Sequence, residues 1–406
     1  MNYLGRRIPE KTFIFGIGLL FVLLSIQPIF GTNSSSMLKA EFSSKIKEDT
    51  GMPTEVTENS EDNCYGILVP LIHGENLPYT SIQQSISNLI NDLLRMNISV
   101  YWASSNFTTL SIKTGESAPS DFYFERGTFI IPFTGNMTID VLIASIAHDY
   151  ESKSEIEEYY PVEMYYLMEP LTLDMHPLNY PKVAYHFGGA IGIMDLLWYL
   201  EDLQMGGFLD NYLLMDDEIA DRLNNTDYNL FIWSGSNTGL GYKPLIETGL
   251  HIKANTAIRD FINNGGGYIG SCYGANAASS GIFIPFNMPQ CYIKKIPTAF
   301  CLSLTSALSI NTNFAGITTA KIVNRSHPVS FGLEKIQKSF YAYGPVFPWF
   351  SLDQNTQPLA ILEDVRCLWS RQRFNFLPSD MVKKSIEHSL GKPIWVSSQF
   401  GKGKII

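Results

Sequence analysis

The stretch GGGYIGSCYGANAASS, residues 265–280, joins an apolar strand-like segment to a run of small helix-forming residues. Gly270, Cys272 and Gly274 make a G-x-C-x-G pattern at the join. Glycines on both sides of a nucleophile permit the tight, strained strand-to-helix turn of a nucleophile elbow. At such a turn the helix N-terminus favours thiolate over thiol, and the Tyr273 amide can point at a developing oxyanion. The pattern predicts that Cys272 is a catalytic nucleophile, with a small buried cysteine at a glycine-rich turn as the alternative.

The segments before the elbow alternate between strand and helix patterns. PKVAYHFG (residues 181–188) and YNLFIWSGS (residues 228–236) are typical of buried strands, and ANTAIRDFINNGG (residues 254–266) is typical of a helix that ends in glycine. Alternation at this pace indicates a mostly parallel sheet covered on both faces. We therefore expect an α/β fold over residues 182–406, with a flavodoxin-like parallel sheet and helices on both faces.

Several ordered motifs resemble those of class I glutamine-amidotransferase-like domains, most of all the type at the N-terminus of fungal-style biotin-protein ligases. The elbow resembles the form GGGY-x-G-x-C-x-G-A. Three downstream segments resemble the family's His-Pro, Tyr-x-Gly-Pro and closing-hairpin motifs: NRSHPVSFGLEKI (residues 324–336), FYAYGPVF (residues 340–347) and PIWVSSQFGKGKII (residues 393–406). The resemblance covers about residues 182–406. It does not imply ligase activity, because no segment resembles a biotin-adenylating domain.

The same resemblance implies site residues and no cofactor. It places Cys272 as the nucleophile and the Gly235 and Ser236 amides, beside that of Tyr273, as oxyanion donors. Relatives have Pro-Gly-Gly where this chain has Ser-Gly-Ser. In relatives the histidine base follows the Gly-Lys-Gly hairpin by a few residues, whereas this sequence ends at Ile406. We therefore expect a piece of a longer protein, with an absent triad as the alternative.

The remaining polar residues give weaker signals. His327 and His388 follow the elbow, and the histidines at 73, 148 and 186 precede it. Structural or surface roles are favoured for all five, although His186 ends a predicted strand at the edge that borders the ligand crevice in open parallel sheets. The acidic cluster of Asp216, Asp217 and Glu218 is typical of a solvated loop or helix start. No C-x-x-C pair or Cys/His spacing indicates a metal site.

The N-terminal part of the chain indicates export. Residues 1–31 combine three basic residues with an apolar run, which predicts a signal peptide or an N-terminal membrane anchor. Residues 32–62 are typical of a flexible linker. Six glycosylation triplets agree with an exported chain, at Asn33, Asn97, Asn106, Asn136, Asn224 and Asn324. With five cysteines, one possibility is two disulfides plus a reactive Cys272, and the other is five reduced thiols.

Residues 63–181 are expected to form a smaller α/β domain. CYGILVPLIHG and ISVYW suit strands on either side of a helix, which would make one β-α-β unit. The helix is indicated by apolar residues at helical spacing: Ile82, Ile86, Leu89, Ile90, Leu93 and Leu94.

The predicted function is a secreted or membrane-anchored cysteine hydrolase or amidase acting on a small-molecule or peptide amide. The alternatives are a non-catalytic cell-surface ligand-binding module of the same fold and a structural surface protein. An uncleaved N-terminal segment would make the membrane a partner. The net charge of −10 and the lack of a basic stripe argue against nucleic acid.

Overall fold

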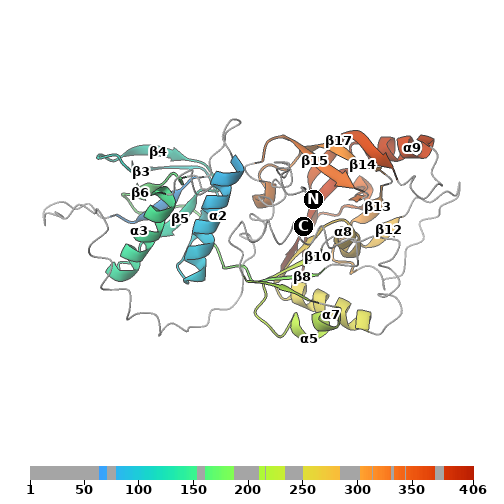
Figure 1. Ribbon diagram of the computed structural model, residues 1–406, viewed down its shortest axis with the longest axis horizontal. Helices are drawn as coiled ribbons and strands as arrows, with labels where there is room; N and C mark the ends of the chain where they lie inside the picture. Colours follow the sequence, from blue (N-terminus) through green and yellow to red (C-terminus); the bar gives the residue numbers. More distant parts are fainter. Residues whose placement is uncertain are drawn as a thin grey trace, which may run out of the picture. The chain divides into compact units, whose positions relative to one another are not determined.

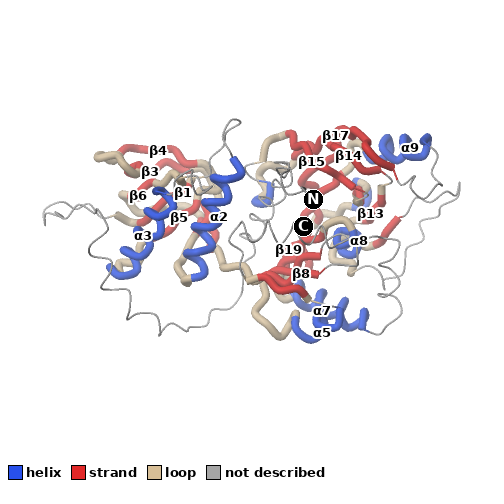
Figure 2. Tube along the Cα trace, viewed as in Figure 1, coloured by secondary structure: helices blue, strands red, loops and turns tan. Residues whose placement is uncertain are grey.

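The computed structural model describes residues 64–70, 79–152, 161–186, 210–214, 216–233, 250–283, 302–312, 314–330, 333–342, 344–370 and 379–406. These residues divide into two compact units between Leu178 and Asn179 (Figures 1 and 2). The expected targeting segment and linker lie outside the described residues. Within the described ranges, no helix is both long and apolar enough to cross a membrane.

The N-terminal unit contains a seven-stranded sheet in which every neighbouring pair is antiparallel. The strand order is β4-β3-β6-β1-β5-β2-β7. The strands are β1 (Gly66–Val69), β2 (Tyr101–Ala103), β3 (Phe107–Lys113), β4 (Ser120–Phe124), β5 (Phe129–Pro132), β6 (Tyr165–Leu167) and β7 (Met175–Pro177).

Two helices, α2 (Tyr79–Arg95) and α3 (Met137–Ser152), pack side by side against this sheet (Figure 1). The expected apolar face of α2 is confirmed, because all six predicted residues are at most 7% exposed. The helix ends in a Schellman motif: Asn97 has φ 59°, and the amides of Ile98 and Asn97 donate to the carbonyls of Leu93 and Leu94. An asparagine tolerates this left-handed conformation better than most residues.

The topology corrects the expected β-α-β unit. Strand β5 lies between β1 and β2, so β1-α2-β2 is split, and β5-α3-β6 is split in the same way by β1. The central order β6-β1-β5-β2 with these two helices is the β-α-β-β-α-β arrangement of ferredoxin-like folds. The β3–β4 hairpin and β7 extend the sheet at its two edges.

The C-terminal unit contains a nine-stranded sheet with the order β15-β14-β17-β18-β19-β11-β10-β8-β9. Its strands are β8 (Val183–His186), β9 (Asn211–Leu213), β10 (Leu230–Trp233), β11 (Gly267–Gly270), β14 (Phe314–Ile322), β15 (Ile336–Ala342), β17 (Thr356–Ser370), β18 (Pro393–Phe400) and β19 (Gly403–Ile405). The strands from β19 to β9 pair in parallel, and those from β15 to β19 pair antiparallel.

The expectation of a flavodoxin-like parallel sheet is therefore wrong. The alternation of strand and helix holds only before the elbow, whereas the long strands after it form antiparallel ladders. Strand β14 shows the reason, because its residues alternate between buried and half-buried over most of its length. That period suits an antiparallel strand with one face less covered. The expected closing hairpin is confirmed: β18 and β19 pair across a turn at Gly401, which has φ 58°.

Shorter elements surround the sheet. The helices are α5 (Asp216–Arg222), α7 (Leu250–Asn263), α8 (Tyr273–Ala278) and α9 (Ser379–Ser389), with 3-10 turns η2 (Pro328–Ser330) and η3 (Trp349–Ser351). A second sheet joins β12 (Gly281–Phe283), β13 (Leu308–Asn311) and β16 (Pro345–Val346). Strands β10 and β11 are almost wholly buried in the main core, with Phe231 and Tyr268 at 0% exposure. The elbow therefore follows directly after a strand that is buried in the core.

Candidate active site

Cys272 lies at the turn between β11 and α8, as the sequence pattern predicts. Its backbone has φ 51° and ψ −102°, a conformation that residues other than glycine rarely adopt. The Cys272 carbonyl accepts the first helical hydrogen bond of α8, from the Asn276 amide at 3.1 Å. The side chain is half-buried. A strained strand-to-helix turn with a partly accessible sulfur is the geometry of a nucleophile elbow.

The two flanking glycines are required by close backbone contacts. A Cβ atom on Gly270 would lie 2.6 Å from the carbonyl carbon of Gly274. A Cβ atom on Gly274 would collide with the carbonyl oxygen of Trp233, on the neighbouring strand β10. The buried Tyr268 hydroxyl donates to the Gly274 carbonyl at 2.7 Å and so connects the first turn of α8 to strand β11. The G-x-C-x-G spacing thus follows from backbone packing on both sides of Cys272.

A buried polar layer fastens α8 to strand β13. The Asn276 side-chain amide donates to the Asn311 side-chain carbonyl at 2.7 Å, and both residues are at most 3% exposed. The Ser279 hydroxyl bonds the Asn276 carbonyl at 2.6 Å and lies 3.2 Å from the Ser309 hydroxyl. Buried hydrogen bonds of this kind rigidify the elements that they connect. Sequence reasoning missed this layer, because the pairs that join α8 to β13 lie 30 or more residues apart in the sequence.

His186 reaches the same edge of the sheet but is packed as a core residue. In the register of the parallel strands, His186 aligns with Trp233, and Trp233 aligns with Gly270. Two strand spacings, roughly 10 Å, therefore separate the backbones of His186 and Gly270. The His186 Nδ1 must donate to the Leu214 carbonyl at 2.9 Å, because a carbonyl only accepts. Its ring meets Trp233 edge-on at 5.2 Å and is 4% exposed, which supports the structural role favoured from sequence.

Tyr341, which sequence reasoning did not single out, lies close enough to Cys272 for a charge on the thiol to affect its hydroxyl. It lies on β15 within the Tyr-x-Gly-Pro segment, and its hydroxyl donates to the Pro345 carbonyl at 2.8 Å. Burial of the hydroxyl raises the pKa of Tyr341; a hydrogen bond with Thr312 acts in the opposite direction, and the charge of a Cys272 thiolate adds to the rise. Tyr341 therefore stays protonated at neutral pH, as a hydrogen-bond donor and not as a base.

The other predicted site residues are distributed as follows. Gly235 and Ser236, the oxyanion donors implied by the resemblance, lie outside the described residues, as does His73. Tyr273 begins α8 directly after Cys272, so its amide lies at the elbow.

The histidines away from the elbow occupy local structural positions. The His327 Nδ1 accepts from the Val329 amide at 3.3 Å and so begins the turn η2. His388 is in the last turn of α9, where burial and then the charge of Lys392 lower its pKa.

The acidic cluster is a helix start, as expected. Asp216 begins α5, and Glu218 pairs with Arg222 one turn later at 2.9 Å on the exposed surface. Among the residues that the structure describes, no group of three or more His, Cys, Asp or Glu side chains is placed to hold a metal ion.

The cysteines are spread over both units. The Cys64 thiol donates to the Gly66 carbonyl at 3.5 Å, and burial raises the pKa of Cys64. Cys367 is exposed on β17. Cys291 and Cys301 lie outside the described ranges. The expected pairing of four of these cysteines therefore stays a prediction.

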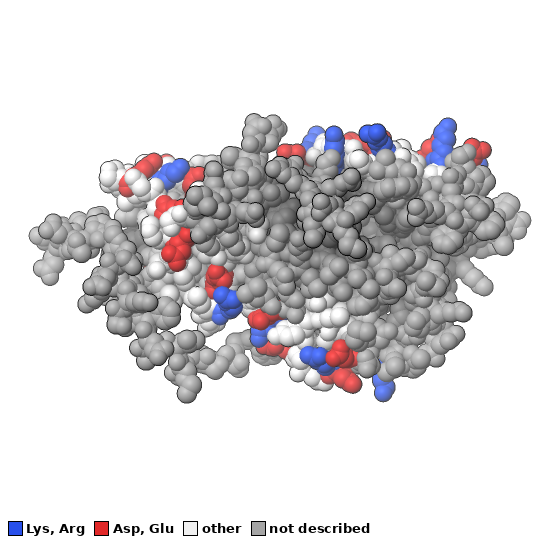
Figure 3. Space-filling view, viewed as in Figure 1, with Lys and Arg blue, Asp and Glu red and all other residues white. Residues whose placement is uncertain are grey.

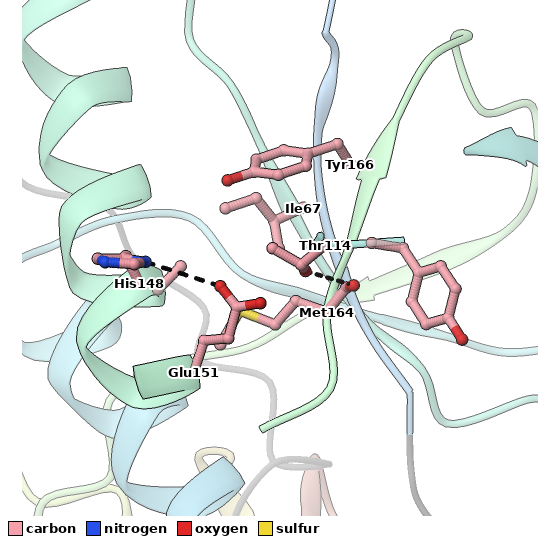
Figure 4. Close-up of a pocket in the computed structure, with 8 residues that line it drawn as sticks. Ile67, Thr114, His148, Glu151, Met164 and Tyr166 are labelled. Atoms are coloured by element: carbon pink, nitrogen blue, oxygen red, sulfur yellow. Dashed lines mark hydrogen bonds and ion pairs between the residues drawn. The ribbon is translucent and has the colours of Figure 1, made fainter. Parts of the chain in front are cut away.

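A small hollow in the N-terminal unit is a second candidate site (Figure 4). It has almost no room for a water molecule and is lined by residues that include Ile67, His148, Glu151 and Tyr166. His148 lies 3.7 Å from Glu151, and the Thr114 hydroxyl donates to the Met164 carbonyl at 2.7 Å. The hollow is therefore too small for a substrate, and its lining residues hold no thiol or serine nucleophile.

The described charged side chains on the face shown in Figure 3 include both Lys and Arg and Asp and Glu. The absence of a nucleic-acid partner stays a prediction.

Comparison with known proteins adds little to this geometry. No family model matches the chain, and no curated protein matches it in sequence. The crystal structure of a protein from Bacteroides uniformis described as ThuA-like matches with a TM-score of 0.33 and 13% sequence identity. The match covers 56% of this chain and 81% of that chain. A likeness this distant supports no inference about activity.

Proposed function

We propose that the C-terminal unit is a glutamine-amidotransferase-like domain of the biotin-protein-ligase N-terminal type, in which Cys272 is the nucleophile of an exported hydrolase or amidase. The observation that carries the proposal is the conformation of Cys272, a non-glycine residue at φ 51° between strand and helix. Strain of this kind persists only where the surroundings impose it, and it clusters at functional sites. Here the flanking glycine contacts and the Asn276–Asn311 bond impose it.

In the proposed reaction the Cys272 thiolate attacks the carbonyl carbon of an amide substrate. A sulfur–carbon bond forms, the carbon–nitrogen bond breaks, and the amine leaves with the proton that a base has taken from the thiol. Water then hydrolyses the thioester to a carboxylic acid and restores the thiol. The Tyr273 amide, together with those of Gly235 and Ser236, would stabilise the oxyanion.

The direction of β19 supports a base from the C-terminal side. β19 pairs in parallel with β11, and the Ile406 carbonyl accepts from the Gly270 amide at 2.8 Å. β19 therefore runs toward the edge of the sheet where Cys272 lies. The family resemblance implies that the histidine base follows this strand.

Acyl transfer to Cys272 tests the proposal. The chain is incubated with p-nitrophenyl acetate, and acetylated cysteines are mapped by peptide mass spectrometry. Attack by Cys272 would break the ester carbon–oxygen bond, release p-nitrophenolate and leave an acetyl thioester on the Cys272 peptide. We expect acetylation of Cys272 to be faster than that of exposed Cys367, and to be absent in Cys272→Ala.

Equal acetylation of Cys272 and Cys367 would contradict a nucleophilic role. It would leave the non-catalytic ligand-binding module as the better account. Cys367→Ala is the matched control, since Cys367 lies exposed on β17 and the elbow should not change.

A further inference from the structure

The described glycosylation triplets fall into groups according to which side-chain atom the fold uses. An asparagine side chain has a carbonyl oxygen, which accepts hydrogen bonds, and an amide nitrogen, which donates them. An N-linked glycan is attached to the nitrogen. A triplet whose oxygen is held by the protein and whose nitrogen is left to solvent is therefore suited to carry a glycan.

Asn106 and Asn136, both in the N-terminal unit, are anchored through oxygen. The Asn106 Oδ1 accepts from the Arg126 amide at 2.8 Å. The Asn136 Oδ1 accepts from the Thr138 and Ile139 amides at 3.1 and 3.4 Å, where it caps α3. Both asparagines are exposed, and neither side-chain nitrogen bonds another described residue. A glycan on either nitrogen would leave these anchoring bonds intact.

Asn224 and Asn324, both in the C-terminal unit, are anchored through nitrogen. The Asn224 Nδ2 donates to the Ala257 carbonyl on α7 at 2.9 Å. The Asn324 Nδ2 donates to the Gln357 side chain at 3.1 Å, while its Oδ1 accepts from the Ser326 hydroxyl at 2.9 Å. Asn224 is exposed and Asn324 is half exposed. Glycosylation replaces one of the two amide hydrogens, so a sugar on either nitrogen would leave one hydrogen for the existing bond and would have to fit beside its acceptor. Asn97 anchors neither atom, so the fold does not orient its amide.

The oxygen-anchored triplets also lie beside the two large apolar side chains that are most exposed among the described residues of their unit. Met137, the middle residue of one triplet, is 82% exposed. Tyr123 is 62% exposed and lies directly opposite Thr108, the third residue of the other triplet, in the β3–β4 pair. Single exposed apolar residues are common, but a glycan attached at these positions would cover them.

We infer that the N-terminal unit carries N-linked glycans at Asn106 and Asn136, whereas Asn224 and Asn324 keep unmodified amides. The inference rests on the export that is part of the proposed function, and it is independent of any reaction at Cys272.

Glycan mapping on the full chain tests the inference. The chain, with its own N-terminal segment, is expressed in mammalian secretory cells and treated with peptide N-glycosidase in heavy-oxygen water, which labels each formerly glycosylated asparagine. We expect label at Asn106 and Asn136 in most copies and none at Asn224 or Asn324. Thr108→Val and Thr138→Val should each abolish label at their own triplet only, while Thr108→Ser and Thr138→Ser should retain it.

Three results would overturn the inference: a chain without label, an unlabelled Asn106 or Asn136, or label at Asn224 or Asn324 that equals theirs. Labelled Asn106 and Asn136 on a chain with an unreactive Cys272 would support the glycan sites and contradict the hydrolase, so the two failures are distinguishable.

Discussion

The segments β1-α2-β2 and β10-α7-β11 have the same order of strand, helix and strand, but their strands are arranged differently. β10 and β11 are parallel neighbours, whereas β5 separates β1 from β2. Asn97 ends α2 at φ 59°, and Cys272 follows β11 at φ 51°. Asparagine tolerates such a conformation at a helix end, whereas a cysteine between strand and helix is strained. Of these two residues, only Cys272 has a conformation that an ordinary helix end does not explain, which is why the candidate site is assigned to the turn after β11.

We expect the greatest loss of stability from a substitution in the core of the N-terminal unit. Leu89 is fully buried in α2, so Leu89→Ala should destabilise the N-terminal unit by about 2–5 kcal/mol through lost burial and a residual cavity. Urea denaturation measures the loss, and the rate of Cys272 alkylation should stay unchanged. Arg95→Ala, at an exposed position of the same helix, is the control and should have little effect. A slower alkylation of Cys272 in Leu89→Ala would show that the stability of one unit affects the other.

The next effect tests the close packing of the elbow. Gly274→Ala forces a Cβ atom onto the Trp233 carbonyl oxygen, and overpacking of this kind costs about 1–3 kcal/mol. Thermal unfolding should show the loss of stability. The rate of Cys272 labelling relative to that of Cys367 should also fall. The matched control is Gly281→Ala, whose Cβ would meet only the flexible Leu308 side chain, at 3.2 Å. Similar stability losses in both variants would argue against a special packing requirement at Gly274.

Three described residues other than glycine have a positive φ, namely Asn97, Cys272 and Ser303, and strain at the first two can be compared directly. Cys272→Gly should stabilise the protein by about 1 kcal/mol, because glycine adopts the required conformation without steric cost. Asn97→Gly should change the free energy of unfolding far less, because asparagine already suits its position. Both values come from denaturant titration. Equal effects would mean that Cys272 is no more strained than an ordinary helix end.

The smallest effect concerns the neighbour of Cys272. Tyr341→Phe removes the hydroxyl that donates to Pro345, which should cost about 0.5–1.5 kcal/mol. Burial raises the pKa of Tyr341 in the folded state, so its contribution is present below the ordinary value of about 10 and is lost as pH rises above it. Wild type should therefore lose more stability than Tyr341→Phe between about pH 9 and about pH 11. Unfolding at each pH is monitored by circular dichroism. An equal loss of stability in wild type and Tyr341→Phe would contradict this contribution of the Tyr341 hydroxyl.

Local elements could be read from the sequence where one residue pattern decides them. The apolar period of α2, the glycines around Cys272 and the turn at Gly401 each follow from local sterics and burial. Strand neighbours could not be read in this way, because the insertion of β5 between β1 and β2 depends on pairing across distant segments. For the same reason the antiparallel ladders of β14, β17 and β18 were not anticipated.

The candidate site follows the same division. Cys272 and its glycines are contiguous in the sequence and were predicted. Asn311 and Tyr341 approach the elbow only through the folding of β13 and β15, and no short motif contains them together with Cys272.

The rate of Cys272 alkylation by iodoacetamide as a function of pH shows whether Cys272 is an activated nucleophile. Peptide mass spectrometry follows Cys272 beside two internal references, exposed Cys367 and Cys64, whose pKa is raised by burial. The account predicts a midpoint for Cys272 well below the ordinary thiol value of about 8.5, and below those of both references. A Cys272 midpoint at or above that of Cys367 would contradict it.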